Sequence, residues 1–315
     1  MTLLTPTEVV NKVQAKQSLA YAELSNINLE GLSLSGGQFF SAYLRTANLS
    51  NSDCKASDFN RAILIRANLR YGTFASANFS KSNLIKADCQ GAKFREAQFL
   101  KAQLQGINFD ETEVSAADFT ETNLSEARGN NVNFTRAIFQ KAILTQSQFQ
   151  DSNFTQTNLR EANLSQVNWE GIIFPNSKLQ KINLTGSRLD KINFHGSSLF
   201  QAILKAANLA RIECQEVDLQ EANFQGSQLS DVDFSHSSLV GTDFEKASLA
   251  DVKFIDANLS NANFKNALLQ GVDLTNCQVE KANFMGVQGL TSQQKADLRE
   301  KGAINVPNPE SDGNG

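Results

Sequence analysis

Residues 57–71 read SDFNR-AILIR-ANLRY, three consecutive five-residue blocks with Phe59, Leu64 and Leu69 at their centres. The spacing continues without a slip in both directions. Every fifth residue from Leu24 to Phe284 is such a centre, 53 in all, and 46 of them are Leu or Phe. Of the 22 Phe in the chain, 20 occupy this position. One short repeat therefore builds most of the protein.

A period of five fits neither standard secondary structure. Five steps of about 100° leave a helical residue about 140° out of phase, and five steps along a strand put it on the opposite face. The chain must therefore turn once per block to keep each centre inside, and four corners close a square. Spacing by 20 supports this, since one column is Phe from Phe39 to Phe139 and the next is Leu from Leu44 to Leu204.

Stacking of these columns predicts a solenoid. The 53 blocks give about 13 coils, which at the roughly 4.8 Å spacing of β-strands make a rod of about 60 Å. The motif A-[DN]-[LF]-x-x, seen at Ala67–Tyr71 and Ala257–Asn261, resembles the pentapeptide-repeat family, including its cyanobacterial members. The resemblance covers about residues 22–288. It implies an all-β fold, a right-handed quadrilateral β-helix.

Both ends of the predicted solenoid carry signals for a short helix. Thr5-Pro6-Thr7-Glu8 and Thr291-Ser292-Gln293-Gln294 each match a capping box. Such caps keep the terminal coils from exposing core or unpaired edges. We therefore expect an N-terminal helical cap over 1–21, the solenoid over 22–288, a C-terminal helical cap over 289–303 and a disordered tail over 304–315.

Composition limits the classes of function. A net charge of -4 and a pI near 5.4 argue against a general nucleic-acid binder. The N-terminus lacks the basic and apolar regions of a signal peptide, and no stretch approaches the roughly 18 apolar residues of a membrane span. The four Cys are far apart without a CxxC pair, which favours a reducing cytoplasm. We expect no membrane contact and no direct contact with nucleic acid.

No catalytic or metal-binding pattern stands out from the repeat. The sequence lacks a glycine-rich phosphate loop, a GxSxG elbow and an HExxH motif. His195 and His236 fall on turn positions, where exposed polar filler is the simpler interpretation. Cys54, Cys89 and Cys214 replace core Leu or Phe, and Cys277 takes the small inward position, as small hydrophobic residues do. We expect neither an enzyme nor a cofactor.

Gly129 is the sharpest local anomaly, because a glycine occupies a core centre. One interpretation is a pocket or a kink. The other, which we favour, is that Phe109 and Phe149, one coil to either side, fill the space. An unfilled Leu-sized hole would cost roughly 2 to 5 kcal/mol.

Charge is unevenly spread along the repeat. Residues 55–101 carry a net charge of +6 and residues 213–256 carry -8. Within the basic part, two ladders of cations at spacing 20 flank one face, on which apolar side chains occupy outward positions. Exposed apolar groups beside charges indicate a protein-binding patch, although β-branched residues also simply suit an exposed strand. The predicted patch consists of Tyr43, Arg61, Ile63, Ile65, Arg66, Lys81, Ile85, Lys86 and Lys101.

Two functions remain from these observations. The first is a non-enzymatic interaction scaffold or structural spacer with an unknown protein partner, as a monomer or an end-to-end dimer. The second follows from the resemblance, since some family members mimic duplex DNA and act on gyrase. DNA carries one charge per roughly 1.7 Å. A net charge of -4 over the expected rod gives one per roughly 15 Å, which weighs against mimicry.

Overall fold

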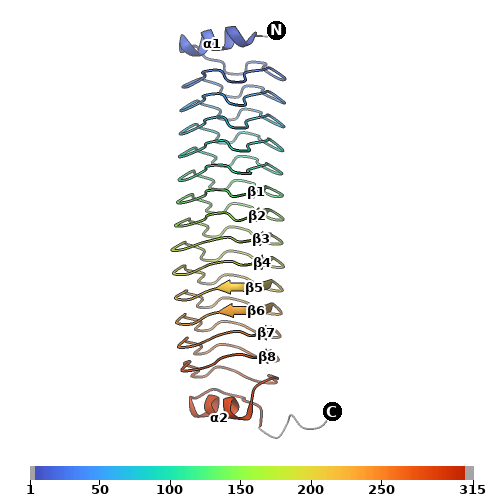
Figure 1. The fold of residues 1–315 in the computed structure, drawn as a ribbon, viewed down its shortest axis with the longest axis vertical. Helices are drawn as coiled ribbons and strands as arrows, with labels where there is room; N and C mark the ends of the chain where they lie inside the picture. Colours follow the sequence, from blue (N-terminus) through green and yellow to red (C-terminus); the bar gives the residue numbers. More distant parts are fainter. Residues whose placement is uncertain (1–3, 309–315) are drawn as a thin grey trace. The chain divides into compact units, whose positions relative to one another are not determined.

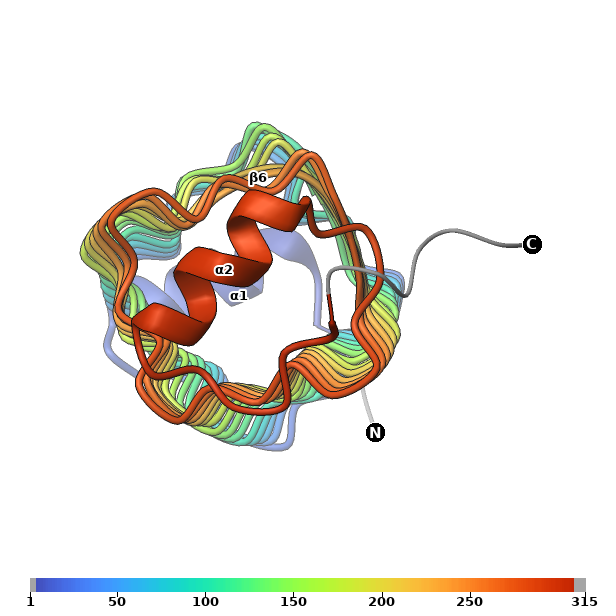
Figure 2. The same cartoon turned by 90° about the horizontal axis from the view of Figure 1, so that it is seen from below.

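The computed structural model describes residues 4–308, which divide into two compact units at the Asn163–Leu164 junction. Each unit is described by itself. Both consist of square coils of four blocks, which are shown from the side in Figure 1 and end-on in Figure 2. The quadrilateral β-helix of the pentapeptide-repeat type is therefore confirmed.

The block around Phe59 shows how five residues make one side and one corner. The N–H of Phe59 donates to the carbonyl of Asn78 in the next coil at 2.8 Å, which fixes the side. The N–H of Ala62 then donates back to the carbonyl of Phe59 at 2.9 Å, which closes a turn. Arg61, the last residue of the block, has a φ of 57°. This left-handed conformation at the third turn residue redirects the chain by one corner.

Parallel bridges between residues 20 apart hold successive coils in register. In the first unit Tyr43 pairs with Ile63, and Ile63 pairs with Asn83. In the second unit Ile203 pairs with Asn223 in the same way. Four blocks per turn, expected from the columns of Phe and Leu, are confirmed by these bridges.

All named strands include the same side of the coils, and two of them continue past the corner onto the next side. The first unit contains β1 (Arg128–Asn130) and β2 (Gln148–Gln150), which pair in parallel. The second unit contains six successive parallel strands, each paired with the next. They are β3 (Asn168–Glu170), β4 (Arg188–Asp190), β5 (Asn208–Glu213), β6 (Gln228–Asp233), β7 (Ser248–Ala250) and β8 (Leu268–Gln270).

Counted by the named strands β1 to β8, the structure has about seven turns. This number is smaller than the 13 coils expected from the sequence. Coils before Arg128 carry isolated bridges in place of strands. The reason is that a side often pairs through a single residue before the chain turns again.

The core consists of stacked centres. All centres from Leu24 to Phe284 are buried except Leu274, which is half-buried. The rings of Phe99 and Phe119 stack in the first unit with centroids 4.8 Å apart, and those of Phe244 and Phe264 stack in the second unit at 4.9 Å. Like residues thus pack on like residues, one coil apart.

Space at Gly129 is filled, as we expected. A methyl group built on Gly129 would lie 2.6 Å from Cγ2 of Val132, 3.1 Å from Cε1 of Phe149 and 3.2 Å from Cβ of Phe109. The two Phe predicted to compensate are in contact range, and Val132 contributes as well. The glycine therefore marks tight packing and not a pocket.

Helices cover the two ends of the described chain. α1 (Pro6–Gln14) is capped by Thr5 and α2 (Ser292–Glu300) is capped by Thr291. Each cap forms the predicted capping box, with Glu8 and Gln294 respectively. α2 crosses the last coils of the second unit (Figure 2). Of the expected disordered tail over 304–315, residues 309–315 lie outside the described residues, and Ile304 bridges Asn283.

Candidate interaction surface

The predicted patch lies on the side of the first unit whose core centres are Leu44, Leu64 and Leu84, together with the corners before and after that side. We call this surface the Leu64 face. Tyr43 and Ile63 occupy outward positions on this face in adjacent coils, and they pair with each other in a parallel bridge. Tyr43 is 40% exposed, whereas Ile63 is half-buried.

A shallow groove of about 370 Å³ runs along the second corner of the Leu64 face. Ile65 and Ile85, which stand one coil apart, line it together with Arg66 and Lys86. The repeat normally puts polar residues at the positions of the two Ile, so the groove is apolar where a solvated turn would be polar. The structure therefore brings four residues of the predicted patch together around one groove, namely Ile65, Arg66, Ile85 and Lys86.

Arg45 and Thr46 also line the groove and were missed by the sequence analysis. The signal was present, because Arg45 lies 20 residues before Ile65 and Thr46 lies 20 before Arg66. The column then continues beyond Ile85 to Gln105, whose Oε1 is buried and has no hydrogen-bond partner among residues 4–308. The Ile column is therefore bordered by Arg45 at one end and by an unsatisfied acceptor at the other.

The predicted cations all occupy corner positions. Arg61, Lys81 and Lys101 form the ladder before the Leu64 side, and Arg66 and Lys86 form the ladder after it. Each has a φ of 57° or 58° and an exposed side chain. The left-handed corner therefore projects these long side chains into solvent on both borders of the face.

Ion pairing distinguishes one of the five cations from the others. Lys101 lies 3.3 Å from the carboxylate of Glu121. Arg61, Arg66, Lys81 and Lys86 make no ion pair within the described chain. Lys101 is thus locally neutralised, and the uncompensated positive charge concentrates around Ile65 and Ile85.

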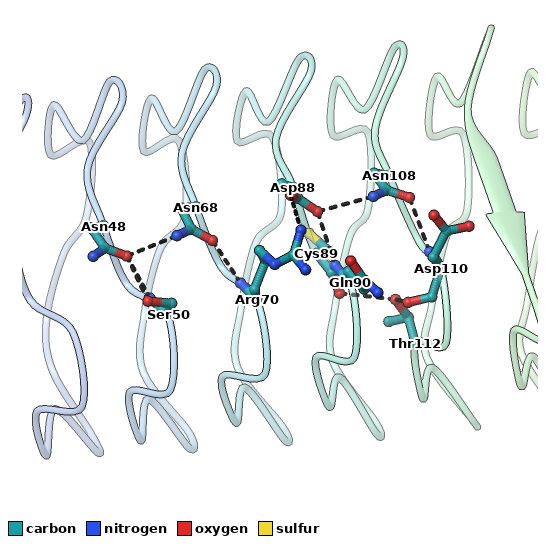
Figure 3. A network of polar contacts seen from close by, with 10 residues as sticks. All are labelled: Asn48, Ser50, Asn68, Arg70, Asp88, Cys89, Gln90, Asn108, Asp110 and Thr112. Atoms are coloured by element: carbon teal, nitrogen blue, oxygen red, sulfur yellow. Dashed lines mark hydrogen bonds and ion pairs between the residues drawn. The ribbon is translucent and has the colours of Figure 1, made fainter.

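The adjacent side of the first unit carries an amide ladder with a structural role (Figure 3). The side-chain amide of Asn68 donates to Oδ1 of Asn48 at 3.0 Å, and that of Asn108 donates to Oδ1 of Asp88 at 3.0 Å. Each of these residues also accepts the N–H two residues ahead, as Asn68 does from Arg70 at 3.1 Å. The recurrent Asn of the repeat therefore caps the next turn, as Asx turns do.

An ion pair belongs to the same network. Nη1 of Arg70 lies 3.0 Å from Oδ2 of Asp88, and the guanidinium sits 5.5 Å from the ring centre of Tyr71. Arg70 is accordingly occupied by partners within the protein. This side differs from the Leu64 face, where the cations around Ile65 have none.

The four cysteines, a residue type that is often a nucleophile or a metal ligand, are packed in the interior of this protein. Cys54, Cys89, Cys214 and Cys277 are buried and free of disulfides. Burial raises the pKa of Cys54 to about 12 and also raises the pKa of Cys89 and Cys214. Their thiols therefore stay protonated and weakly nucleophilic at neutral pH.

The two histidines are exposed, as expected. His195 and the side chain of His236 face solvent, and Nδ1 of His236 lies 3.8 Å from Oδ2 of Asp256. Among residues 4–308 no cluster of three or more His, Cys, Asp or Glu could hold a metal ion. No helix in the same range is long and apolar enough to cross a membrane.

Acidic residues of the second unit are distributed around the coils. Asp218, Asp231, Asp233 and Asp243 lie in blocks on four different sides. Some acids near this region are also compensated, as Asp190 is by Arg211. The acidic stretch 213–256 therefore does not form one continuous face.

Family models identify the repeat. The model described as pentapeptide repeat region matches residues 122–199 and 227–293, and the model described as pentapeptide repeats (8 copies) matches 38–70 and 74–110. Together they cover more than half of the chain. The chain belongs to the pentapeptide-repeat family.

Solved structures of other proteins are similar to this one, among them a pentapeptide-repeat protein. HetL from the cyanobacterium Nostoc sp. strain PCC 7120, involved in heterocyst differentiation regulation, is 23% identical over 90% of this chain and 96% of its own, with a TM-score of 0.24. QnrB1, a plasmid-mediated fluoroquinolone resistance protein, is 16% identical over 62% of this chain and 96% of its own, with a TM-score of 0.36. A search of the curated proteins found no match.

Proposed function

We propose that this pentapeptide-repeat protein is a non-enzymatic interaction scaffold or structural spacer in a reducing compartment such as the cytoplasm, and that its Leu64 face contacts a protein partner. One observation carries the proposal. Ile65 and Ile85 line a groove whose neighbouring cations lack ion-pair partners within the described chain. An apolar strip with a charged border is the usual arrangement of a protein interface.

The two components of this surface contribute differently to binding. Apolar and aromatic side chains that lose water on binding, here Tyr43, Ile65 and Ile85, supply most of the affinity at an interface. Charges on the rim mainly guide association and lose their effect as salt rises. The partner that fits is therefore an acidic protein surface with an apolar centre.

Absence of enzymatic activity is part of the proposal. It is supported by the uses of the reactive side chains, because the Cys thiols are buried and protonated and the His side chains are exposed at turns. The register of the repeat also continues without interruption from Leu24 to Phe284. An active site would be expected to break it.

Modulation of a type II topoisomerase such as gyrase, by mimicry of DNA, is the alternative. It rests on the family resemblance alone. Mimicry requires a dense line of negative charge, whereas the acids of 213–256 are spread over four sides. We expect the purified protein neither to inhibit gyrase supercoiling nor to relieve its inhibition by a quinolone at micromolar concentration. Activity at that concentration would favour the alternative.

Capture from extracts of the native cell tests the scaffold function. Tyr43→Ala with Ile65→Ala should weaken capture at every salt concentration, whereas Lys81→Glu with Lys86→Glu should weaken it mainly at low salt. Lys93→Glu with Arg95→Glu, two exposed cations on the opposite side of the first unit, is the matched control. If this control abolishes capture while both test variants bind as wild type does, the Leu64 face is ordinary exposed strand.

A further inference from the structure

The last coil of the second unit leaves part of its core uncovered. Leu274 is the one core centre between Leu24 and Phe284 that is half-buried and not buried. A cavity of about 390 Å³ lies over it, between the coil and α2. That volume falls within the range of about 300 to 1,000 Å³ that is usual for ligand sites.

The cavity combines an apolar floor with a charged rim. Val272, Leu274 and Leu298 supply the apolar part, and Asp273, Asp297 and Lys301 supply the charges. Oδ1 of Asp273 accepts the N–H of Thr275 at 2.9 Å. Hydrogen bonds from Thr275 lower the pKa of Asp273, so its carboxylate is ionised at neutral pH.

Backbone donors also point out of this edge. In the preceding coils the N–H of Phe234 donates to the carbonyl of Lys253 at 2.8 Å, and the N–H of Phe254 donates to the carbonyl of Asp273 at 2.8 Å. The N–H of Asp256 donates likewise to the carbonyl of Thr275 at 3.0 Å. Leu274 and Asn276 occupy the next equivalent positions, and within residues 4–308 their N–H groups have no acceptor.

The matching carbonyl on this edge is already satisfied. Nε2 of Gln294 in α2 donates to the carbonyl of Val272 at 2.9 Å, the position at which a further coil would donate its own N–H. The cap therefore replaces one partner of the missing coil and leaves two donors open. Unpaired donors at a sheet edge are a template for another strand.

We propose that the open edge at Leu274 and Asn276 binds an extended segment of another protein as an added strand. Carbonyls of two alternate residues of the segment accept the N–H groups of Leu274 and Asn276, and the side chain between them enters the cavity over Leu274. Strand addition of this kind takes affinity from main-chain hydrogen bonds and specificity from side-chain pockets. All the residues involved lie in 272–301, so the site is independent of the Leu64 face.

Charge identifies the segment further. The segment residue directly before the inserted side chain lies over Asp273, as Lys253 pairs with Asp273 from the preceding coil. Asp297 adds a second carboxylate to the rim of the cavity. Lys301 is the one cation among the charged rim residues. The segment that fits therefore has a basic residue directly followed by a large apolar residue.

A peptide with the sequence of residues 251–257, capped at both ends, is a direct probe because it reproduces the preceding rung, Lys253-Phe254-Ile255. At saturating peptide, amide exchange at Leu274 and Asn276 should slow at least about tenfold. Exchange at Phe254 and Asp256, whose N–H groups are already paired, should not change and serves as the internal control. Absence of binding at millimolar peptide, or binding without protection of the two amides, would overturn the proposal.

Reversing the charges tests the preference for a basic residue. Asp273→Lys should weaken binding of this peptide about tenfold and restore binding of a peptide carrying Lys253→Glu, whereas the exposed control Asp231→Lys should do neither. Protection of the two amides by raising the protein concentration without peptide would show that a second copy covers the edge, which would overturn the assignment to another protein. Equal binding of both peptides to both proteins would overturn the charge assignment.

Discussion

Phe59 and Phe79 lie 20 residues apart in the sequence, and their rings stack with centroids 4.9 Å apart and planes inclined by 5°. The contact joins one coil to the next through the core. Phe119 continues the same column and stacks on both Phe99 and Phe139 at 4.8 Å. Stability in such a stack comes mainly from contacts between adjacent coils.

Phe119→Ala should accordingly destabilise the protein by roughly 3 to 5 kcal/mol, as large-to-small changes in a core do. His195→Ala and His236→Ala, at exposed turns, should each change stability by about 0.5 kcal/mol or less. Urea titration followed by circular dichroism would compare the three variants. Similar effects for all three would mean that the interior is misassigned.

Gly129→Ala should destabilise the protein by about 1 to 3 kcal/mol, because the added methyl group would overlap Val132 and crowd Phe149. An empty pocket would give the reverse result, since the methyl group would then gain contacts. Gly226→Ala is an instructive comparison. It has open space around its Cβ and a φ of 66°, so any cost there comes from backbone strain and not from packing.

Corners should reject β-branched side chains. Among the non-glycine residues of positive φ in residues 4–308, Thr46 is the one β-branched side chain. Arg61, with a φ of 57°, should therefore tolerate replacement by glycine but lose about 1 to 2 kcal/mol on replacement by isoleucine. Thermal unfolding of Arg61→Gly and Arg61→Ile would measure the difference. Equal melting temperatures would show that the corner relaxes into another conformation.

Much of this architecture could be predicted because the same five-residue pattern recurs 53 times in the sequence. A single block such as Ala67–Tyr71 is weak evidence, but columns of like residues at spacing 20 allow few other folds. The filling of the space at Gly129 could also be predicted, from Phe109 and Phe149 one coil to either side. The part taken by Val132 could not, because it lies in the next block around the corner.

The candidate surfaces were less accessible from the sequence. The Leu64 face could be predicted because Ile65 and Ile85 are apolar at positions where the repeat usually has polar residues. Arg45 was missed because an Arg at such a turn position agrees with that polar pattern. Pairing of Lys101 with Glu121 requires side-chain geometry that spacing alone does not supply. The open edge at Leu274 was missed for another reason. It depends on how much of the last coil α2 covers, which no periodicity encodes.

Alkaline pH should destabilise the protein through its buried thiols. Burial raises the pKa of Cys54 to about 12, whereas a cysteine in the unfolded chain has a pKa of about 8.5. The folded state therefore holds the proton more tightly, and this contribution to stability is complete below about pH 8.5 and is lost as pH rises toward 12.

At pH 10 the loss from one such thiol is about 2 kcal/mol, since each pKa unit corresponds to about 1.36 kcal/mol. Cys54→Val, a change to a similar small apolar side chain, should leave stability at pH 7 within about 1.5 kcal/mol of wild type and should reduce the loss between pH 7 and pH 10 by about 2 kcal/mol. Urea titrations of both proteins at the two pH values provide the measurement, and the tyrosines common to both cancel in the comparison. If wild type and variant lose the same stability over this range, the Cys54 thiol ionises as readily in the folded protein as in the unfolded chain, and its burial has been overstated.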